Sequence, residues 1–491
     1  MMLATLLQGM ATPERDAPLS DITLDSREVR EGSVFLACRG ARHHGLDFAQ
    51  DVATRGATAI LWEPDGARRP PELRSDIIVL PVPALREQAS RLAARFFGEP
   101  SHELSVTGVT GTNGKTTTAW LLAQSLGASG RRAAYLGTLG AGFDGQLQAG
   151  EYTTPDAIGV QRKLAAFRAQ GADCVAMEVS SHALDQYRVA DVRFEAAVFT
   201  NLTRDHLDYH GSMDAYGEAK ARLFDAAGLQ TRVVNADDAF GARLLSRAAF
   251  ASAIATSSAA DYAPRAGRAF LQARDIVATA TGTRFQLVSS FGDASVESRL
   301  VGRFNVDNLL GVLGVLLGRG QPLSGAVAAV SQAEAPPGRL QTFGGGALPL
   351  VVVDYAHTPD ALAKALQVLR GHCTGRLVCV FGCGGERDAG KRPEMARVAQ
   401  ASADGILITD DNPRGEDPVS IVKDVLRGAP TARVVHDRAE AIREAIGSAR
   451  AGDVVLVAGK GHEDYQLVGK EKRPFSDAAV VRAVLSARGA A

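Results

Sequence analysis

The segment Thr110-Gly111-Thr112-Asn113-Gly114-Lys115-Thr116-Thr117 combines the residue types of a phosphate-binding loop. A Gly-rich turn between a strand and a helix directs backbone N–H groups and a helix N-terminus at phosphate. Lys115 would reach the outer phosphates of a nucleotide, and Thr116 would place its hydroxyl on Mg²⁺. The general pattern has Gly six residues before the Lys, where this chain has Val109. The segment therefore predicts ATP binding without matching the strict motif.

Lys220 falls inside the apolar stripe of a helix that we predict from Ser212 to about Ala227. The lysine is four residues from both Tyr216 and Phe224, on the same helix face. Burial disfavours an ammonium group and lowers its pKa. A neutral amine is a nucleophile, and it can also react with carbon dioxide to give a carbamate, which is an anionic metal ligand. The alternative is a lysine whose amine extends along the surface to solvent, which is the commoner arrangement.

Acidic and imidazole side chains follow two predicted strands. Glu178 ends one strand, and His206, with Asp205 and Asp208, comes just beyond another. Ligands gather at the carboxyl ends of strands in open α/β sheets. These residues predict an oxygen-rich Mg²⁺ site with one imidazole, although a single His is more often structural. The predicted metal ligands are Thr116, Glu178, His206 and Lys220 as a carbamate.

Strands and helices alternate in the middle third of the chain and would position these groups. Strands are predicted at Leu104 to Thr110, Cys174 to Val179 and Ala196 to Thr200. A helix is predicted from Thr116 to Leu126, and Gly127 is expected to end it. This alternation indicates a mostly parallel sheet with helices on both faces.

The last third alternates more clearly and predicts a second, Rossmann-like doubly wound domain. Its predicted strands are Leu350 to Asp354, Leu377 to Phe381, Gly405 to Thr409, Arg433 to His436 and Val454 to Ala458. Polar clusters follow these strands, which predicts a binding site at one edge of the sheet. The clusters are Asp354 to Asp360, Gly382 to Arg392, Asp410 to Arg414 and Gly459 to Glu463.

Composition excludes several classes of protein. The chain has 491 residues, with 54 Lys plus Arg against 55 Asp plus Glu, so no basic field favours nucleic acid or a membrane surface. No apolar run approaches the roughly 18 residues that span a bilayer. The N-terminus has no basic region before its apolar residues, which argues against a signal peptide. The five cysteines are odd in number, which argues against a disulfide framework. We expect a cytoplasmic monomer with small-molecule substrates, no nucleic-acid partner and no membrane insertion.

Two Pro- and Gly-containing segments, Gly98 to Ser101 and Pro336 to Gly338, are expected to be linkers because these residues interrupt helices. They predict an α/β protein of three domains, at residues 1–98, 99–335 and 336–491. The first is the smallest and its pattern is the least decisive.

Several motifs together resemble the Mur ligases, and the resemblance covers the whole chain. They include the phosphate loop, Lys220, Glu178-Val179-Ser180-Ser181-His182, Asn201-Leu202-Thr203-Arg204-Asp205-His206-Leu207-Asp208, Leu24-Asp25-Ser26-Arg27, Thr153-Thr154-Pro155-Asp156, Asp354-Tyr355-Ala356-His357-Thr358-Pro359-Asp360 and Gly459-Lys460-Gly461-His462-Glu463. The resemblance implies an N-terminal UDP-MurNAc-binding domain, a central ATP-binding domain and a C-terminal amino-acid-binding domain. It also implies that ATP phosphorylates the D-glutamyl carboxylate of UDP-N-acetylmuramoyl-L-alanyl-D-glutamate, and that an amine then attacks the acyl phosphate.

The resemblance also assigns roles to individual residues. Those implied to be catalytic are Lys115, Glu178, His206 and a carbamylated Lys220. Those implied to bind the UDP-muramoyl dipeptide are Leu24, Ser26, Thr153, Thr154, Ser180, Gln186 and Arg188. Those implied to bind ATP are Gly111, Thr112, Asn113, Gly114, Lys115, Thr116, Thr117, Asn305 and Asn308. Arg188 is a natural partner for a carboxylate of the substrate. Asn305 and Asn308 could instead cap a helix. The resemblance also places Ala41-Arg42-His43 at the nucleotide-sugar, where residues vary within the family.

The added amine is predicted from the last domain. meso-Diaminopimelate differs from lysine by a second carboxylate, and Arg414 could bind that carboxylate with two parallel hydrogen bonds. Asp411-Asn412-Pro413-Arg414 matches the signature of diaminopimelate-adding Mur ligases. Arg387 is the predicted second carboxylate partner and Glu463 the predicted ammonium partner, with Gly459 beside it. The alternative for Asn412 to Arg414 is an ordinary surface turn.

Three other functions stay open. A folylpolyglutamate synthetase would share the phosphate loop and Lys220 but lack the UDP-sugar domain, so Leu24 to Phe35 argues against it. A lysine-adding Mur ligase is opposed by Arg414. A motor or nucleic-acid-dependent ATPase would need a basic face, which the even charge balance does not provide.

Overall fold

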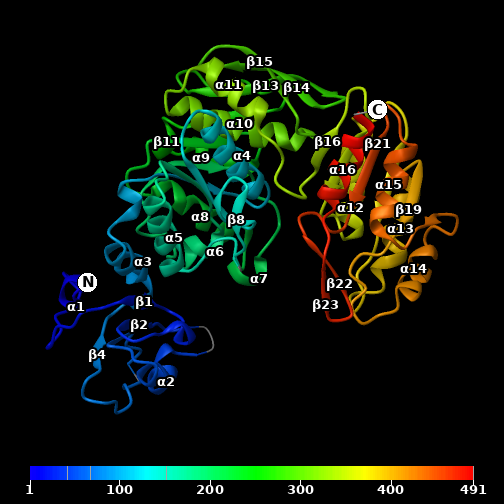
Figure 1. Cartoon of the computed structure of the whole chain (residues 1–491). Helices are drawn as coiled ribbons and strands as arrows, with labels where there is room; N and C mark the ends of the chain where they lie inside the picture. The colour runs from blue at the N-terminus through cyan, green and yellow to red at the C-terminus, as the bar shows by residue number, and fades with distance from the viewer. Residues whose placement is uncertain (41–42, 67, 151, 490–491) are drawn as a thin grey trace. The chain divides into compact units, whose positions relative to one another are not determined.

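The computed structural model describes residues 1–40, 43–66, 68–150 and 152–489, so the Ala41-Arg42 part of the predicted nucleotide-sugar segment lies outside the described residues. The chain divides into two compact units, Met1–Ile254 and Ala255–Ala491. Figure 1 labels helices and strands of both. Each unit is α/β, which confirms the predicted fold class. Among the described residues, no helix is long and apolar enough to cross a membrane.

The first unit begins with a four-stranded parallel sheet in the order β1-β2-β3-β4. The strands are β1 (Asp21–Thr23), β2 (Ser33–Ala37), β3 (Ala59–Trp62) and β4 (Ile78–Pro81), and the helices are α1 (Leu3–Leu6), α2 (Ala49–Thr54) and α3 (Leu85–Phe96). Alternate residues of β2 enter different cores: Val34 and Leu36 pack with α1 and α3, whereas Phe35 and Ala37 pack with α2. Both faces of this sheet are therefore covered, as the near-continuous apolar run of β2 requires.

A larger sheet follows in the same unit, with the order β11-β10-β5-β9-β6-β7-β8. Its strands are β5 (Ser105–Thr110), β6 (Ala133–Gly137), β7 (Gly140–Phe143), β8 (Gln146–Gln148), β9 (Cys174–Glu178), β10 (Phe194–Phe199) and β11 (Thr231–Asn235). β9, β5, β10 and β11 are parallel, and β7 and β8 add an antiparallel edge. β5 lies between β9 and β10, so the chain leaves β5 toward one side of the sheet and returns to the other. Ligands bind beyond the carboxyl ends of strands at such a switch point.

The helices of this part of the chain connect those strands. They are α4 (Lys115–Ala128), α5 (Ala157–Ala169), α6 (Ser181–Asp185), α7 (Leu207–His210), α8 (Met213–Ala221) and α9 (Ala239–Ser246). Two predicted helix ends are wrong. α4 continues through Gly127, and Gly130 with φ +82° provides the left-handed end instead. The helix predicted to reach Ala227 is α8, which ends at Ala221 and is followed by a 3₁₀ turn at Arg222–Asp225.

Among the described residues, the second unit contains two larger groups of strands and a two-stranded hairpin. One contains β12 (Ile254–Ser257), which begins at the unit boundary, with β13 (Phe270–Thr279), β14 (Gly282–Ser289) and β15 (Ala294–Ser298); helices α10 (Arg303–Gly318) and α11 (Leu323–Gln332) follow. The other has the order β16-β17-β21-β18-β19-β20, parallel except for β16. Its strands are β16 (Gln341–Gly344), β17 (Leu350–Asp354), β18 (Leu377–Phe381), β19 (Gly405–Ile408), β20 (Arg433–Val434) and β21 (Val454–Ala458).

The C-terminal sheet is doubly wound. Helices α12 (Pro359–Arg370), α13 (Lys391–Ser402) and α14 (Pro418–Leu426) pack on one face, in the core that contains Leu350 and Val352. Helices α15 (Arg438–Ser448) and α16 (Asp477–Gly489) pack on the other face with Val351 and Val353. A hairpin of β22 (Tyr465–Val468) and β23 (Glu471–Pro474) follows β21. The Rossmann-like arrangement is confirmed, whereas the three domain boundaries stay a prediction.

Candidate active site

The predicted phosphate loop joins β5 to α4, because β5 ends at Thr110 and α4 begins at Lys115. Gly111 and Gly114 have φ values of +154° and +84°, which favour glycine. A Cβ atom on Gly111 would lie 1.8 Å from the Thr200 Oγ1 atom, so a side chain does not fit there. The turn thus brings the N-terminus of α4 to the carboxyl edge of the sheet, where its amide groups favour an anion.

Residues after β10 hold the loop in this shape. The Asn201 carbonyl accepts the Thr112 N–H at 2.8 Å, and its Oδ1 atom accepts the Asn113 N–H at 2.9 Å. The Thr200 hydroxyl donates to the Asn113 carbonyl at 2.6 Å. The segment that begins at Asn201 therefore bonds directly to the predicted phosphate loop.

Lys115 and Lys220 meet at one carbonyl group. The Nζ atom of Lys115 donates to the Gly111 and Thr112 carbonyls at 3.0 and 2.9 Å, and that of Lys220 donates to the Gly111 carbonyl at 2.7 Å. Lys220 is only 1 % exposed, and its amine lies 4.4 Å from the centre of the Tyr216 ring. Burial, and then repulsion from Lys115, lower the pKa of Lys220 to about 6. The predicted burial of Lys220 is confirmed.

Glu178 is fully buried at the end of β9 and accepts a ring of hydrogen bonds. Its Oε2 atom accepts the Thr116 hydroxyl at 2.9 Å, and its Oε1 atom accepts the Thr138 N–H at 2.8 Å and the Tyr135 hydroxyl. The sequence pattern did not single out Tyr135 or Thr138. Two predicted metal ligands, Thr116 and Glu178, thus place their oxygen atoms side by side, which fits a hard cation such as Mg²⁺.

His206 lies in a cluster of aromatic and imidazole rings. The His206 ring centre is 4.8 Å from that of His182 and 5.9 Å from that of Tyr216, the ring that Lys220 also contacts. Burial lowers the pKa of His182 and of His210, which favours their neutral forms. Among the described residues, no three or more His, Cys, Asp or Glu side chains group closely enough to hold a metal ion. Since the predicted set has only two residues of these types, the metal site stays a prediction.

A cavity of about 840 Å³ opens beside these groups in the first unit. Its lining includes four of the predicted substrate-binding residues, Leu24, Ser26, Gln186 and Arg188. Three further cationic side chains also line it: Arg27, which ends a motif noted in the sequence, and Arg39 and Arg86, which sequence patterns missed. The volume suits a sizeable small molecule. Asp25, Asp51 and Asp156 also line the cavity and Asp25 bonds to Arg27, so Arg39, Arg86 and Arg188 are the cations that suit an anionic group.

Thr154 connects this cavity to the phosphate loop. Arg188 donates to the Gln186 Oε1 atom at 2.7 Å and to the Thr154 carbonyl at 2.9 Å, and burial lowers the pKa of its guanidinium. The Thr154 hydroxyl donates to the Glu178 carbonyl at 2.9 Å and accepts the Ser180 N–H at 3.1 Å. The predicted Thr153 lies at hydrogen-bond distance, 3.0 Å, from the Thr138 hydroxyl. The cavity and the nucleotide loop are therefore one continuous hydrogen-bonded structure.

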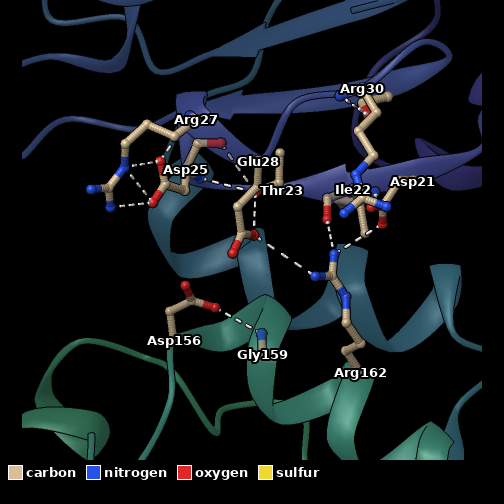
Figure 2. A network of polar contacts seen from close by, with 11 residues as sticks. Asp21, Ile22, Thr23, Asp25, Arg27, Glu28, Arg30, Asp156, Gly159 and Arg162 are labelled. Atoms are coloured by element: carbon tan, nitrogen blue, oxygen red, sulfur yellow. Dashed lines mark hydrogen bonds and ion pairs between the residues drawn. The ribbon is translucent and has the colours of Figure 1, made fainter. Parts of the chain in front are cut away.

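Arg162 on α5 holds the cavity segment Leu24 to Arg27 from below, as Figure 2 shows. Its Nη2 atom donates to the Asp21 Oδ1 atom at 2.9 Å and to the Ile22 carbonyl at 2.8 Å, and its Nη1 atom is 3.8 Å from Glu28 Oε2. Asp21 precedes the cavity segment and Glu28 follows it. One guanidinium therefore contacts both flanks of the segment, a role that no sequence motif indicated.

The predicted amino-acid site forms at the carboxyl edge of the sheet in the second unit. Arg414 has φ +52°; its N–H donates to the Leu467 carbonyl at 3.0 Å and its Nη1 atom to the Gly385 carbonyl at 2.9 Å. A Cβ atom on Gly384 would lie 2.8 Å from Arg414 Nη1 and 3.8 Å from Arg387 Cγ. The two predicted carboxylate partners thus flank one glycine.

The remaining predicted residues of this site also come together. A Cβ atom on Gly459, which has φ +116°, would lie 2.8 Å from the Asp411 Oδ2 atom. Burial raises the pKa of Asp411. The Asn412 Nδ2 atom donates to the Glu463 Oε2 atom at 2.9 Å. Pro413, which lies between Asn412 and Arg414 in the sequence, is buried. The segments around Asn412 and Glu463, far apart in sequence, therefore contact each other, and their binding of an amino acid stays a prediction.

Asn305 and Asn308 belong to the first turns of α10 in the second unit. The Asn305 amide donates to the Val301 carbonyl at 2.8 Å, and the Asn308 amide donates to the Asn305 Oδ1 atom at 2.9 Å. The N-cap residue is Gly302, which has no side chain, so the capping alternative is wrong. Their contact with a nucleotide stays a prediction.

Comparison with known proteins shows the family of this chain. Three sequence models match in order: the Mur ligase family catalytic domain at residues 18–97, the Mur ligase middle domain at 109–316, and the Mur ligase glutamate ligase domain at 338–461. A UDP-N-acetylmuramoyl-L-alanyl-D-glutamate–2,6-diaminopimelate ligase from Ectopseudomonas mendocina is 49 % identical over 99 % of both chains. The chain belongs to the Mur ligase family.

Solved structures show the same relationship for this Mur ligase. A structure of a UDP-N-acetylmuramoyl-L-alanyl-D-glutamate–2,6-diaminopimelate ligase is 36 % identical, covers 96 % of each chain and has a TM-score of 0.73. A folylpolyglutamate synthase from Mycobacterium tuberculosis is 18 % identical, with a TM-score of 0.55. That match covers 76 % of this chain and 92 % of the synthase, and it shows the fold alone.

Proposed function

We propose that this Mur ligase adds meso-2,6-diaminopimelate to the D-glutamyl side-chain carboxylate of UDP-N-acetylmuramoyl-L-alanyl-D-glutamate, with ATP, in the synthesis of a peptidoglycan precursor. The observation that carries the proposal is the 49 % identity, over 99 % of both chains, to a ligase named for these compounds. The paired arginines of the second unit support the choice of amine. We expect the reaction to occur in the cytoplasm and the enzyme to act as a monomer.

The first unit would bind the nucleotide-sugar in the cavity and ATP at the phosphate loop. The arginines of the cavity can neutralise a diphosphate, and Arg188 can bind a substrate carboxylate beside Thr154. Thr154 bonds to the main chain of Glu178, the residue that accepts the Thr116 hydroxyl. This continuity would place the carboxylate that is to be activated near the phosphates of ATP.

The reaction has two steps. A carboxylate oxygen of the substrate attacks the γ-phosphorus of ATP, ADP leaves, and an acyl phosphate forms. The neutral amine nitrogen of diaminopimelate then attacks the acyl carbon and gives up one proton, and phosphate leaves from the tetrahedral intermediate to give the amide. Lys115 and the N-terminus of α4 would stabilise the negative charge that moves between phosphate oxygens in the first step.

Thr116, Glu178, His206 and a carbamylated Lys220 would hold Mg²⁺, which neutralises charge on phosphate oxygens when it is bound. Lys220 suits carbamylation because burial lowers its pKa to about 6, so its amine is mostly neutral at pH 7. The amine nitrogen adds to the carbon of carbon dioxide and loses one proton, which leaves an anionic carbamate. The Lys115 ammonium group, which repels a protonated Lys220 amine, would attract the negatively charged carbamate.

The second unit would select the amino acid. Arg414 and Arg387 flank Gly384 and offer two guanidinium groups to carboxylates, while Glu463 offers a carboxylate to an ammonium group. Lysine lacks the second carboxylate and would leave one arginine without a partner, which such sites penalise strongly. This arrangement favours diaminopimelate over lysine.

Release of phosphate from ATP by the purified protein tests the function. Phosphate should appear only when both UDP-N-acetylmuramoyl-L-alanyl-D-glutamate and meso-diaminopimelate are present, and a tripeptide product should accumulate in equal amount. Omission of either substrate is the control. Phosphate release that needs neither compound, or that needs a folate instead, would refute the proposal.

A further inference from the structure

Lys460 is a fully buried lysine at the predicted amino-acid site. It follows Gly459 directly after β21, and its side chain is 0 % exposed. Its Nζ atom donates to the Asn412 Oδ1 atom at 3.0 Å and to the Glu463 Oε2 atom at 2.9 Å. A buried amine is costly unless it is paired, so this position needs an explanation.

Lys460, Asn412 and Glu463 form a closed triangle of hydrogen bonds. Lys460 donates to both other side chains, and the Asn412 amide donates to the same Glu463 Oε2 atom at 2.9 Å. Burial raises the pKa of Glu463, but the bonds from Lys460 and Asn412 outweigh burial and hold the pKa below its ordinary value. Glu463 is therefore kept as a carboxylate. Both bonds from this triangle end on Oε2, so neither of them occupies Oε1.

The triangle also fixes the segment that carries Arg414. The Asn412 Oδ1 atom accepts the Leu467 N–H at 2.9 Å as well as the Lys460 amine. The Leu467 carbonyl accepts the Arg414 N–H at 3.0 Å, and the Arg414 carbonyl accepts the Gly469 N–H at 2.7 Å. Arg414 needs this support because its φ of +52° is unfavourable for a residue with a side chain.

We propose that Lys460 is a positioning residue for the amino-acid substrate: it orients the Glu463 carboxylate toward the substrate ammonium group and, through Asn412, holds Arg414 toward a substrate carboxylate. This role rests on the proposed function. It differs from a purely structural role because the Lys460 amine bonds to two predicted ligand-binding segments at once. Arg438 on α15 and Asp477 on α16 offer a contrast, since that fully buried pair bonds to itself and to the Ala458 carbonyl.

Steady-state kinetics of Lys460→Met test the proposal, with Lys423→Met on the exposed face of α14 as the matched control. We expect Lys460→Met to raise the KM for diaminopimelate at least about 20-fold, which corresponds to the loss of a charge-assisted hydrogen bond. The KM values for ATP and for the nucleotide-sugar should stay within about twofold of wild type. Lys460→Arg keeps a cation and should recover most of the loss. Lys423→Met should match wild type.

The double variant Lys460→Met with Glu463→Gln adds a second measure. If Lys460 acts through Glu463, the double variant should be no worse than the poorer single variant, because coupled residues are not additive. An unchanged KM for diaminopimelate in folded Lys460→Met would overturn the proposal. Unfolding of both the Met and the Arg variants would assign Lys460 to fold stability and would also overturn it. Wild-type protein that ignores diaminopimelate would instead refute the proposed function, so the two failures are distinguishable.

Discussion

Lys115 and Lys220 donate to the same acceptor, the backbone carbonyl of Gly111, at 3.0 and 2.7 Å. Two protonated amines so close repel each other, and burial adds to the cost of charge on Lys220. A carbamate on Lys220 would replace this repulsion with attraction. The proximity of the two lysines thus connects the fold of the phosphate loop to the proposed chemistry.

Lys220→Ala should reduce kcat by about 10²–10³-fold, the range observed when one preorganised electrostatic group is removed. Wild-type protein equilibrated with ¹³C-labelled bicarbonate should show a carbamate signal in its NMR spectrum, and Lys220→Ala should not. Lys423→Ala is the control because that lysine is exposed on α14. Full activity of Lys220→Ala would remove Lys220 from the mechanism.

The stability of unmodified protein should rise with pH because of Lys220. Burial lowers the pKa of Lys220 from 10.5 to about 6 in the folded state, so the unfolded chain binds more protons between these values. Stability therefore increases as pH rises from about 6 toward 10, and the contribution is lost as pH falls through 6. Urea unfolding in buffers without carbon dioxide should give a smaller pH slope for Lys220→Met than for wild type. Equal slopes would contradict the assigned burial effect.

Arg162→Ala should weaken binding of the nucleotide-sugar without affecting ATP. The ion pairs of Arg162 are partly exposed, so we expect the KM for the nucleotide-sugar to rise about 3- to 10-fold, in line with about 1 kcal/mol. The KM for ATP and kcat should not change. Lys163→Ala, one residue along α5, is the control, and Arg162→Lys should recover part of the loss. A uniform fall in kcat for Arg162→Ala would argue for a general structural defect.

Tyr135→Phe should lower kcat about 10- to 100-fold, which corresponds to the loss of one hydrogen bond to a charged group. Its hydroxyl donates to Glu178 Oε1, so its loss would leave the carboxylate less firmly oriented toward Thr116. Thermal unfolding should show that the variant is folded. A wild-type kcat together with wild-type dependence on Mg²⁺ concentration would show that the bond has no catalytic role.

Local sequence patterns predicted the residues of the phosphate loop and Lys220 better than the residues that hold the site in place. The phosphate loop and the burial of Lys220 could be predicted because both follow from short-range spacing along a strand, turn and helix. Tyr135, Arg86 and Arg162 could not, since each acts across the fold from a position whose local sequence is ordinary. The end of α4 was missed for a related reason: Gly127 and Gly130 are both candidate stop signals, and the structure shows that the backbone turns left-handed at Gly130.

The amine specificity of the purified enzyme tests the central claim most directly. The kcat/KM for meso-diaminopimelate should exceed that for L-lysine by a factor on the order of 10⁴, because lysine leaves one guanidinium group of the site without its carboxylate partner. Arg414→Ala should remove most of this preference while the KM for ATP stays near wild type. The result that would contradict the account is equal kcat/KM for L-lysine and meso-diaminopimelate in the wild-type protein.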